Sequence, residues 1–304
     1  MEALLPSLLD EIIELDRGIL ATVVQTRGET YKSVGHKALF GPDSPIPRWG
    51  NIGTGCFDQA ITRIGKDVLE AGAPQIVEFD LSEPTDIHFG SGNFCGGYLE
   101  ILLEAVLPSQ QDVYRRIRDR RLEIDEEHYL VHHLEEGRLE FTPREPESDD
   151  SIFVEPVGSI DRLVIFGATP LARQLVGVLD GLALHPVVCD WREAYLAEFE
   201  RMVSRPVELS MEVPIDDRSL VLVLSHRYAR DREILRRALQ IESPYVGMLS
   251  SESRRDSMLE ELRADGVDAG ALDRVRSPVG LPIGAESDRE IAISIAAELV
   301  RHLS

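Results

Sequence analysis

The sequence is poor in cysteine, lysine and tryptophan, and it has no long apolar segment. Its 304 residues include three cysteines and two tryptophans, and lysine occurs only at positions 32, 37 and 66. Three cysteines are an odd number and too few for a disulfide framework, so we expect reduced thiols. No run approaches the roughly 18 apolar residues that a membrane helix needs, and the N-terminus lacks the basic segment of a signal peptide. These absences favour a cytoplasmic protein without a membrane span.

The formal net charge of −22 argues against nucleic acid as a partner. Affinity for a phosphate backbone depends on Lys and Arg side chains that neutralise it, and a strongly acidic chain repels it. The length favours two domains, because one hydrophobic core usually serves about 100–200 residues.

Residues 1–145 have the pattern of a small α+β domain. Apolar residues recur at helical spacing near the N-terminus and again after Cys56, and short apolar runs between them are typical of strands. The predicted helices are 4–13 and 56–71, the predicted strands are 19–24, 36–40, 75–81 and 98–106, and a hairpin is predicted from 127–134 and 138–142.

The second half follows a different pattern. Residues 146–160 are rich in proline and acidic residues and are predicted to be a linker. From residue 161 to 304, short apolar runs alternate with helical segments, which indicates a Rossmann-like, doubly wound parallel sheet. The predicted strands are 163–166, 186–190, 219–224 and 245–249, and the predicted helices are 170–182, 229–240, 252–264, 288–303 and one that begins near 193.

Two cysteines of the first half stand within glycine-rich segments, residues 50–56 and 90–97. Glycine permits positive φ angles and lets a ligand approach main-chain N–H groups closely. A thiolate is a soft ligand that suits a thiophilic metal centre, although a lone cysteine can also be a small buried residue. The predicted binding residues are Gly53, Gly55, Cys56, Gly92, Cys95, Gly96 and Gly97.

The first strand of the second half leads into a turn, residues 167–172, that is similar to a dinucleotide-binding turn. Gly167 keeps the first glycine of the G-x-G-x-x-G pattern, and Asp190 stands where an acid usually holds a ribose. Thr169 replaces the central glycine, and Pro170 has no N–H to offer a phosphate. Both a nucleotide site and a purely structural turn remain open. His226 follows a later strand at the carboxyl edge, where such sheets bind ligands.

Several charged residues are further candidates. Lys32, Lys37 and Arg48 are placed to lower the pKa of a loop cysteine if the loops converge. Arg254 and Arg255 begin a predicted helix and suit a phosphate or carboxylate.

Two further pairs are read as structural. Asp58 and Glu100, beside the glycine-rich segments, suit the capping of backbone N–H groups. His132 and His133 lie in the predicted hairpin and are expected to be exposed.

Taken together, these segments resemble the XdhC/CoxI family, whose members mature xanthine dehydrogenase and related molybdenum hydroxylases. The resemblance rests on residues 28–35, 50–58 and 92–100, and in the second half on residues 166–172, 224–226, 245–247 and 277–285. The chain departs from the family pattern at Tyr31, Thr54, Asp58, Phe94 and Thr169.

The resemblance implies a maturation factor that binds molybdenum cofactor (molybdopterin) as cargo. It also implies a cysteine desulfurase partner that installs the sulfido ligand, and an apo molybdenum hydroxylase of the xanthine dehydrogenase type that receives the cofactor. Cys56 and Cys95 are then candidate contacts to molybdenum. A homodimer is expected because symmetric association is common.

An alternative is an NAD(P)-dependent oxidoreductase with Asp190 on the ribose and His226 as acid or base. This alternative gives the two glycine-rich cysteine segments no role.

Overall fold

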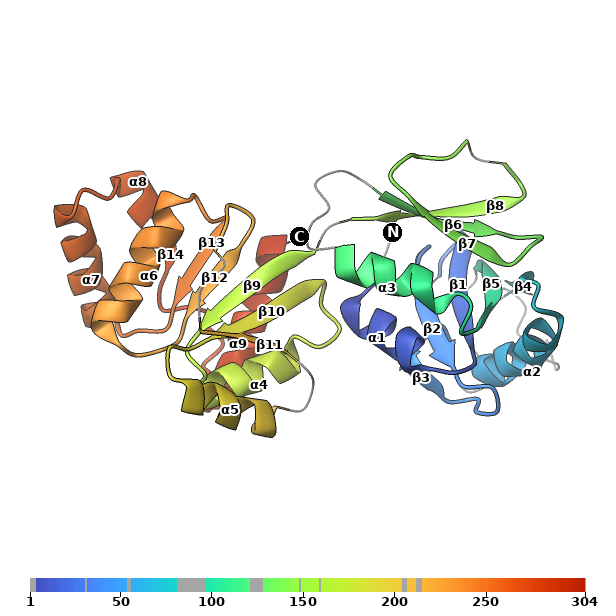
Figure 1. Ribbon diagram of the computed structural model, residues 1–304, viewed down its shortest axis with the longest axis horizontal. Helices are drawn as coiled ribbons and strands as arrows, with labels where there is room; N and C mark the ends of the chain where they lie inside the picture. Colours follow the sequence, from blue (N-terminus) through green and yellow to red (C-terminus); the bar gives the residue numbers. More distant parts are fainter. Residues whose placement is uncertain are drawn as a thin grey trace. The chain divides into compact units, whose positions relative to one another are not determined.

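The computed structural model describes residues 4–30, 32–53, 56–80, 97–120, 128–147, 149–158, 160–203, 207–211 and 215–303, with only the backbone of Cys56. The chain divides into two compact units, Met1–Ser159 and Ile160–Ser304, which we call the first and second units (Figure 1).

The first unit is built on a five-stranded antiparallel sheet with the order β3-β2-β1-β5-β4. β1 lies at its centre and pairs with β2 on one side and β5 on the other. Side chains alternate along β1, so Ile19 and Ala21 belong to one apolar core while Leu20 belongs to another. The strands are β1 (Gly18–Arg27), β2 (Lys37–Phe40), β3 (Pro47–Gly50), β4 (Gln75–Asp80) and β5 (Tyr98–Val106).

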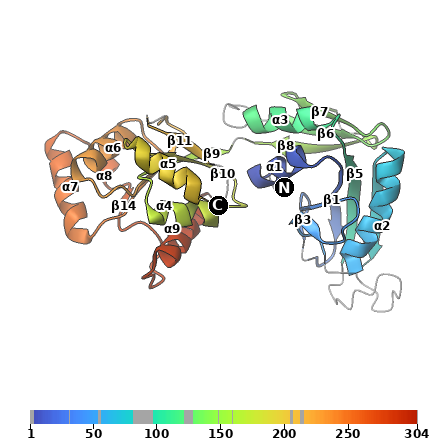
Figure 2. The same cartoon turned by 60° about the horizontal axis from the view of Figure 1, so that its bottom comes forward.

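Each face of this sheet is covered by different elements. Helix α2 (Cys56–Ala71) covers one face with Phe57 and Ile61. Helices α1 (Pro6–Glu14) and α3 (Gln111–Arg120) and a three-stranded sheet cover the other. Figure 2 shows α1 and α2 on opposite sides of β1. The second sheet has the order β7-β6-β8, with β6 (His128–His133), β7 (Arg138–Thr142) and β8 (Ile152–Val157).

Two predictions for the first unit were wrong. The expected linker, residues 146–160, contains β8, which pairs with β6 because Val157 enters the apolar core and Glu155 forms buried ion pairs. Helix α3 was not predicted, since Val113, Tyr114 and Ile117 are its only large apolar residues among many charged ones.

The second unit confirms the prediction of a doubly wound parallel sheet. Its order is β11-β10-β9-β12-β13-β14, with β9 (Asp161–Phe166), β10 (Leu184–Cys189), β11 (Glu208–Ser210), β12 (Leu220–Val223), β13 (Tyr245–Met248) and β14 (Val275–Arg276). One face carries α4 (Pro170–Val178), α5 (Glu193–Met202) and α9 (Asp288–Leu303), and the other carries α6 (Tyr228–Gln240), α7 (Glu252–Ala264) and α8 (Ala269–Leu272). The winding direction reverses between β9 and β12, where such sheets bind ligands.

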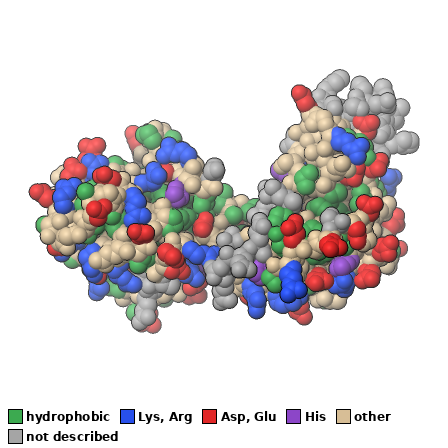
Figure 3. Space-filling model, turned by 90° about the horizontal axis from the view of Figure 1, so that it is seen from above, with side chains coloured by type: hydrophobic (Ala, Val, Ile, Leu, Met, Phe, Trp, Pro, Cys, Tyr) green, Lys and Arg blue, Asp and Glu red, His purple; other side chains and the backbone are tan. Residues whose placement is uncertain are grey.

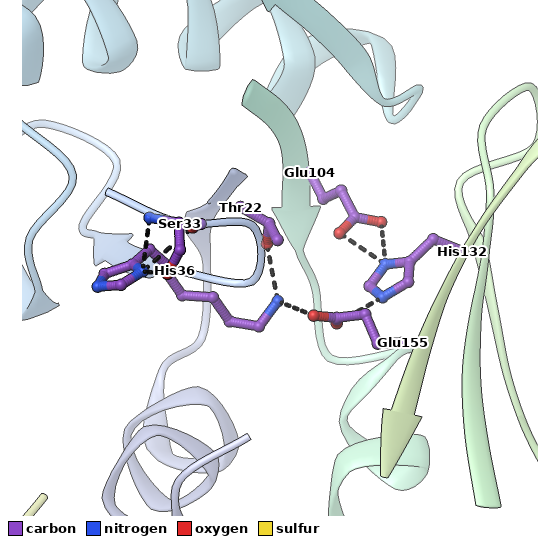
Figure 4. Close-up of polar contacts among 7 residues, drawn as sticks. Thr22, Ser33, His36, Glu104, His132 and Glu155 are labelled. Carbon is purple, nitrogen blue, oxygen red and sulfur yellow. Dashed lines mark hydrogen bonds and ion pairs between the residues drawn. The ribbon is translucent and has the colours of Figure 1, made fainter. Parts of the chain in front are cut away.

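A cluster of charged side chains is buried between the two sheets of the first unit (Figure 4). The two ring nitrogens of His132, on β6, contact Glu104 of β5 at 2.8 Å and Glu155 of β8 at 3.0 Å. Lys37, the first residue of β2, lies 2.7 Å from the other oxygen of Glu155 and donates to Thr22 Oγ1 at 2.9 Å. His132 is 0% exposed, so the prediction of a surface histidine pair was wrong for this residue.

The charges of this cluster stabilise one another. Burial alone would lower the pKa of His132, but Glu104 and Glu155 outweigh it and raise that pKa to about 9. Burial would likewise raise the pKa of Glu155, but Lys37 and His132 outweigh it and lower that pKa to about 2. At neutral pH the cluster therefore holds two carboxylates against two cations.

We predict that His132→Gln lowers the free energy of unfolding of the first unit by about 3–5 kcal/mol, because it leaves buried carboxylates short of a cation. The measurement is urea unfolding followed by Trp49 fluorescence in a Trp191→Phe background, since the sequence has no other tryptophan. The matched control is His133→Gln, whose partly exposed ion pair with Glu140 is worth about 1 kcal/mol or less. Equal losses in the two variants would contradict the role of the cluster.

The same cluster predicts a dependence of stability on pH. The pKa of His132 rises from 6.5 to about 9 on folding, so its stabilisation is complete below pH 6.5 and is lost as pH rises through about 9. Unfolding of the wild type and His132→Gln, measured across that window, should show the stability gap between them narrowing as pH rises. A gap that is constant with pH would rule out a protonated His132.

Candidate functional site

The three segments of the first unit that carry the motifs start or finish at the same end of the five-stranded sheet. Residues 28–36 connect β1 to β2, β3 finishes at Gly50, and α2 starts at Cys56. Asp80, the last residue of β4, pairs with Tyr98, the first residue of β5. Because neighbouring strands are antiparallel, these points share one end of the sheet. We call residues 28–30, Gly53, the first turn of α2 and Gly97 the glycine-loop end.

Close backbone contacts join two of these segments. A side-chain carbon at Gly97 would overlap the carbonyl oxygen of Glu29 and lie 2.5 Å from Thr30 Cγ2, so only glycine fits there. Arg27 pairs with Tyr98 in the ladder, and its guanidinium carbon lies 5.3 Å from the centre of the Tyr98 ring. The first motif therefore packs directly against the residue that follows the second cysteine segment.

The predicted binding residues of the first unit are only partly described. A side-chain carbon at Gly53 would overlap the side chain of Phe57, so this glycine allows the chain to enter α2. Cys56 is the first residue of α2, and its side chain lies outside the described residues. The same holds for the whole of Gly55, Gly92, Cys95 and Gly96. The approach of the two thiols to each other stays a prediction.

The cations expected to act on these thiols differ in availability. Lys37 is 4% exposed and is held by Glu155 and Thr22, so its predicted action on a loop cysteine was wrong. Arg48 forms an exposed ion pair with Glu11 at 3.0 Å. His36, just before Lys37, contacts Ser33 Oγ through Nδ1 at 3.0 Å (Figure 4).

In the second unit, the turn after β9 is filled by its own residues. Gly167 has a φ of +111°, and a side-chain carbon there would lie 2.8 Å from Ser225 Cα. The Ala168 N–H donates to Asp190 Oδ2 at 3.0 Å, and the Thr169 hydroxyl accepts from Ala172 N–H at 3.1 Å. The N–H groups that would bind a phosphate are thus paired within the protein.

Asp190 is also fully engaged. Its Oδ1 accepts from the N–H and Nε of Arg192 at 3.0 Å and 2.8 Å, and its Oδ2 accepts from Arg192 Nη2 at 2.7 Å. Burial alone would raise the pKa of Asp190, but the hydrogen bonds from Arg192 and Ala168 outweigh it and lower that pKa. The carboxylate expected to hold a ribose instead binds the turn that would hold the pyrophosphate. These residues do not fit a dinucleotide.

The next loop along the carboxyl edge holds His226. This residue is exposed and has a left-handed backbone, with φ of +56°. The preceding residue, Ser225, donates to buried Asp231, which Arg254 Nη2 contacts at 2.6 Å. Arg254, predicted to meet a phosphate, is therefore paired within the protein, and Arg255 donates to the carbonyl of Ser277 at 2.9 Å.

Sequence reasoning missed Glu104, His132 and Glu155 as a group. The signal available was a single glutamate within the apolar run of residues 99–107, since a charge inside a buried strand requires a partner. No pattern in the sequence identified that partner, because the three residues come from three separate strands.

Acidic side chains are spread over the face of both units drawn in Figure 3, in keeping with the net charge of −22. Within the described ranges, no group of three or more His, Cys, Asp or Glu side chains is arranged to hold a metal ion. None of the helices over the same ranges has the length and apolar character needed to cross a membrane.

We predict that the purified protein shows no saturable binding of NADH at millimolar concentration, because Ala168 and Asp190 are occupied by each other. The measurement is a titration of NADH fluorescence, with a dinucleotide-dependent dehydrogenase as the positive control. Saturable binding that Asp190→Asn abolishes would contradict this account of the turn.

Two family models match the chain. Residues 163–299 match the XdhC Rossmann domain, and residues 15–80 match the XdhC and CoxI family.

Similar proteins are known from both sequence and structure. The chain is 24% identical to a probable xanthine dehydrogenase component of Bacillus subtilis (strain 168), over 97% of the chain and 96% of that protein. It is 30% identical over 157 residues to the uncharacterized protein YqeB of Escherichia coli (strain K12), which covers 50% of the chain and 29% of that protein. The crystal structure of a xanthine dehydrogenase from Bacillus halodurans has a TM-score of 0.76 and 26% identity, over 98% of the chain and 95% of that structure.

Proposed function

The chain belongs to the XdhC and CoxI family, and we propose that it is an accessory protein of a xanthine dehydrogenase-type molybdenum hydroxylase. The similarity to two proteins named for xanthine dehydrogenase, each over nearly the whole of both chains, supports this proposal. In this function the protein binds molybdenum cofactor, assists its sulfuration and delivers it to the apo-enzyme.

The observation that carries the proposal is the convergence at the glycine-loop end. Three separate stretches of sequence are anchored by strand ends at one end of one sheet, and Gly97 packs against Glu29 and Thr30. Gly97 and Gly53 sit where added side chains would overlap the backbone or Phe57, so glycine is required at both positions. A ligand held between main-chain N–H groups needs such an arrangement.

Helix α2 contributes to the proposed site through its first turn. The N-terminus of a 16-residue helix carries N–H groups that no carbonyl of the helix accepts, together with the positive end of the helix dipole. Both favour an anion such as the phosphate of a pterin cofactor. Cys56 stands in this first turn, where a thiolate is favoured for the same reason. Cys56 and Cys95 would contact the molybdenum or carry sulfur, because thiolate is a ligand that thiophilic metals prefer.

The alternative function, an NAD(P)-dependent oxidoreductase, lacks support from an observation. Asp190 and Ala168 bind each other, and the space above Gly167 is taken by Ser225. The exposed His226 is the residue of the second unit that remains a candidate contact for the cargo.

The partners follow from the same proposal. An apo molybdenum hydroxylase receives the cofactor, and a cysteine desulfurase supplies the sulfur of its sulfido ligand. We further propose that the protein acts in the cytoplasm as a homodimer.

The test is purification from cells that make molybdopterin, followed by assays of molybdenum, of pterin fluorescence after oxidation, and of bound nucleotide. The proposal expects pterin and molybdenum without NAD(P). A protein that carries tightly bound NAD(P) and no pterin, despite proven cofactor supply, would overturn it.

We predict that Cys56→Ala and Cys95→Ala each reduce the pterin and molybdenum retained by the protein, whereas Cys189→Ala does not. Cys189 is the matched control because it is 2% exposed in β10, and burial raises the pKa of its thiol to about 12. Retained pterin and molybdenum per chain are measured for all three variants. Equal retention would remove Cys56 and Cys95 from the site.

A further inference from the structure

Asp58, in the first turn of α2, has a buried carboxylate oxygen without a partner. The residue is 8% exposed, and no donor reaches its Oδ1 in the part of the chain that the structure describes. Buried carboxylates nearly always accept hydrogen bonds, because an unpaired one forfeits its hydration without compensation. The local fold therefore leaves Asp58 incomplete.

Comparison with Asp190 shows what a completed buried carboxylate looks like in this protein. Asp190 is 2% exposed, and each of its oxygens accepts hydrogen bonds from Arg192 or Ala168, which lowers its pKa. For Asp58, burial raises the pKa. The environment of Asp58 thus lacks the donors that a structural carboxylate gathers.

The position of Asp58 ties it to the glycine-loop end. Its neighbour Phe57 contacts Gly53 and stacks at 4.3 Å on the ring of Phe79, near the end of β4. The carbonyl of Asp58 accepts from the hydroxyl of Thr62 at 2.7 Å, which fixes the first turn of α2 while leaving the carboxylate unused. The unpartnered oxygen lies two residues after Cys56, beside the segments proposed to hold the cargo.

We propose that Asp58 accepts hydrogen bonds from the pterin ring of the cargo and so selects for it. A pterin presents an amino group and a ring N–H side by side, and a carboxylate matches such a pair as it matches the fork of a guanidinium. This inference rests on the proposed function, because it names the group that reads the cargo at that same site. It assigns Asp58 recognition of the pterin ring, in place of the capping role expected from the sequence.

The test compares two substitutions that separate binding from packing. Asp58→Asn keeps the size of the side chain and removes the carboxylate, whereas Asp58→Glu keeps the carboxylate and changes the size. Asp67→Asn, an exposed aspartate of the same helix, is the matched control. Each protein is purified from cells that make molybdopterin, and the pterin per chain is measured after oxidation, together with the melting temperature.

We expect Asp58→Asn to retain about tenfold less pterin, or lower still, at an unchanged melting temperature, because hydrogen bonds to a charged acceptor are lost. Asp58→Glu should retain more pterin than Asp58→Asn, and Asp67→Asn should match the wild type. The opposite order, with Asn tolerated and Glu not, would show a packing role and overturn the inference. Equal retention in every variant would overturn it while leaving the proposed function standing. Absence of pterin from the wild type would overturn the proposed function itself.

Discussion

The antiparallel register of β1 with its two neighbours determines where the candidate site lies. Because β2 and β5 both run against β1, the segments that follow β1 and precede β5 meet at one end of the sheet, and Arg27 faces Tyr98 in the ladder. A shift of one residue would turn Ile19, Ala21 and the rest of that row away from the core under α2. The same apolar alternation that builds the core thus places the motif segments together.

The buried cluster around His132 fastens the second sheet of the first unit onto this framework. Its members come from β2, β5, β6 and β8, and each charge has an opposite charge within hydrogen-bonding distance. Lys37 opens β2 directly after the first motif segment, so the cluster also fixes the strand from which that segment departs. Burying paired charges contributes less to stability than apolar packing, but removing one partner is costly, which makes the arrangement specific. The cluster is complete by itself, whereas Asp58 is not.

Much of the fold follows from local pattern, and much of the site does not. Helical spacing predicted α2 and α9, and the apolar run of residues 98–106 predicted β5, because each element buries one continuous face. Helix α3 escaped because charged residues outnumber its apolar ones, and β8 was taken for linker because its proline and acidic neighbours resemble a loop. Asp190 was identified from its position after β10, but its pairing with Arg192 depends on loop geometry that spacing does not encode. The histidine of the buried cluster was likewise misjudged, since its partners are distant in sequence.

The central claim is that cargo binds at the glycine-loop end of the first unit and not at the Rossmann-like turn of the second. Hydrogen exchange measured by mass spectrometry, on the protein with and without molybdenum cofactor, tests this claim most directly. The account predicts that cofactor slows exchange in residues 28–36, 50–58 and 92–100 and leaves residues 167–173 unchanged. Slowed exchange in residues 167–173, with residues 28–36, 50–58 and 92–100 unaffected, would contradict it.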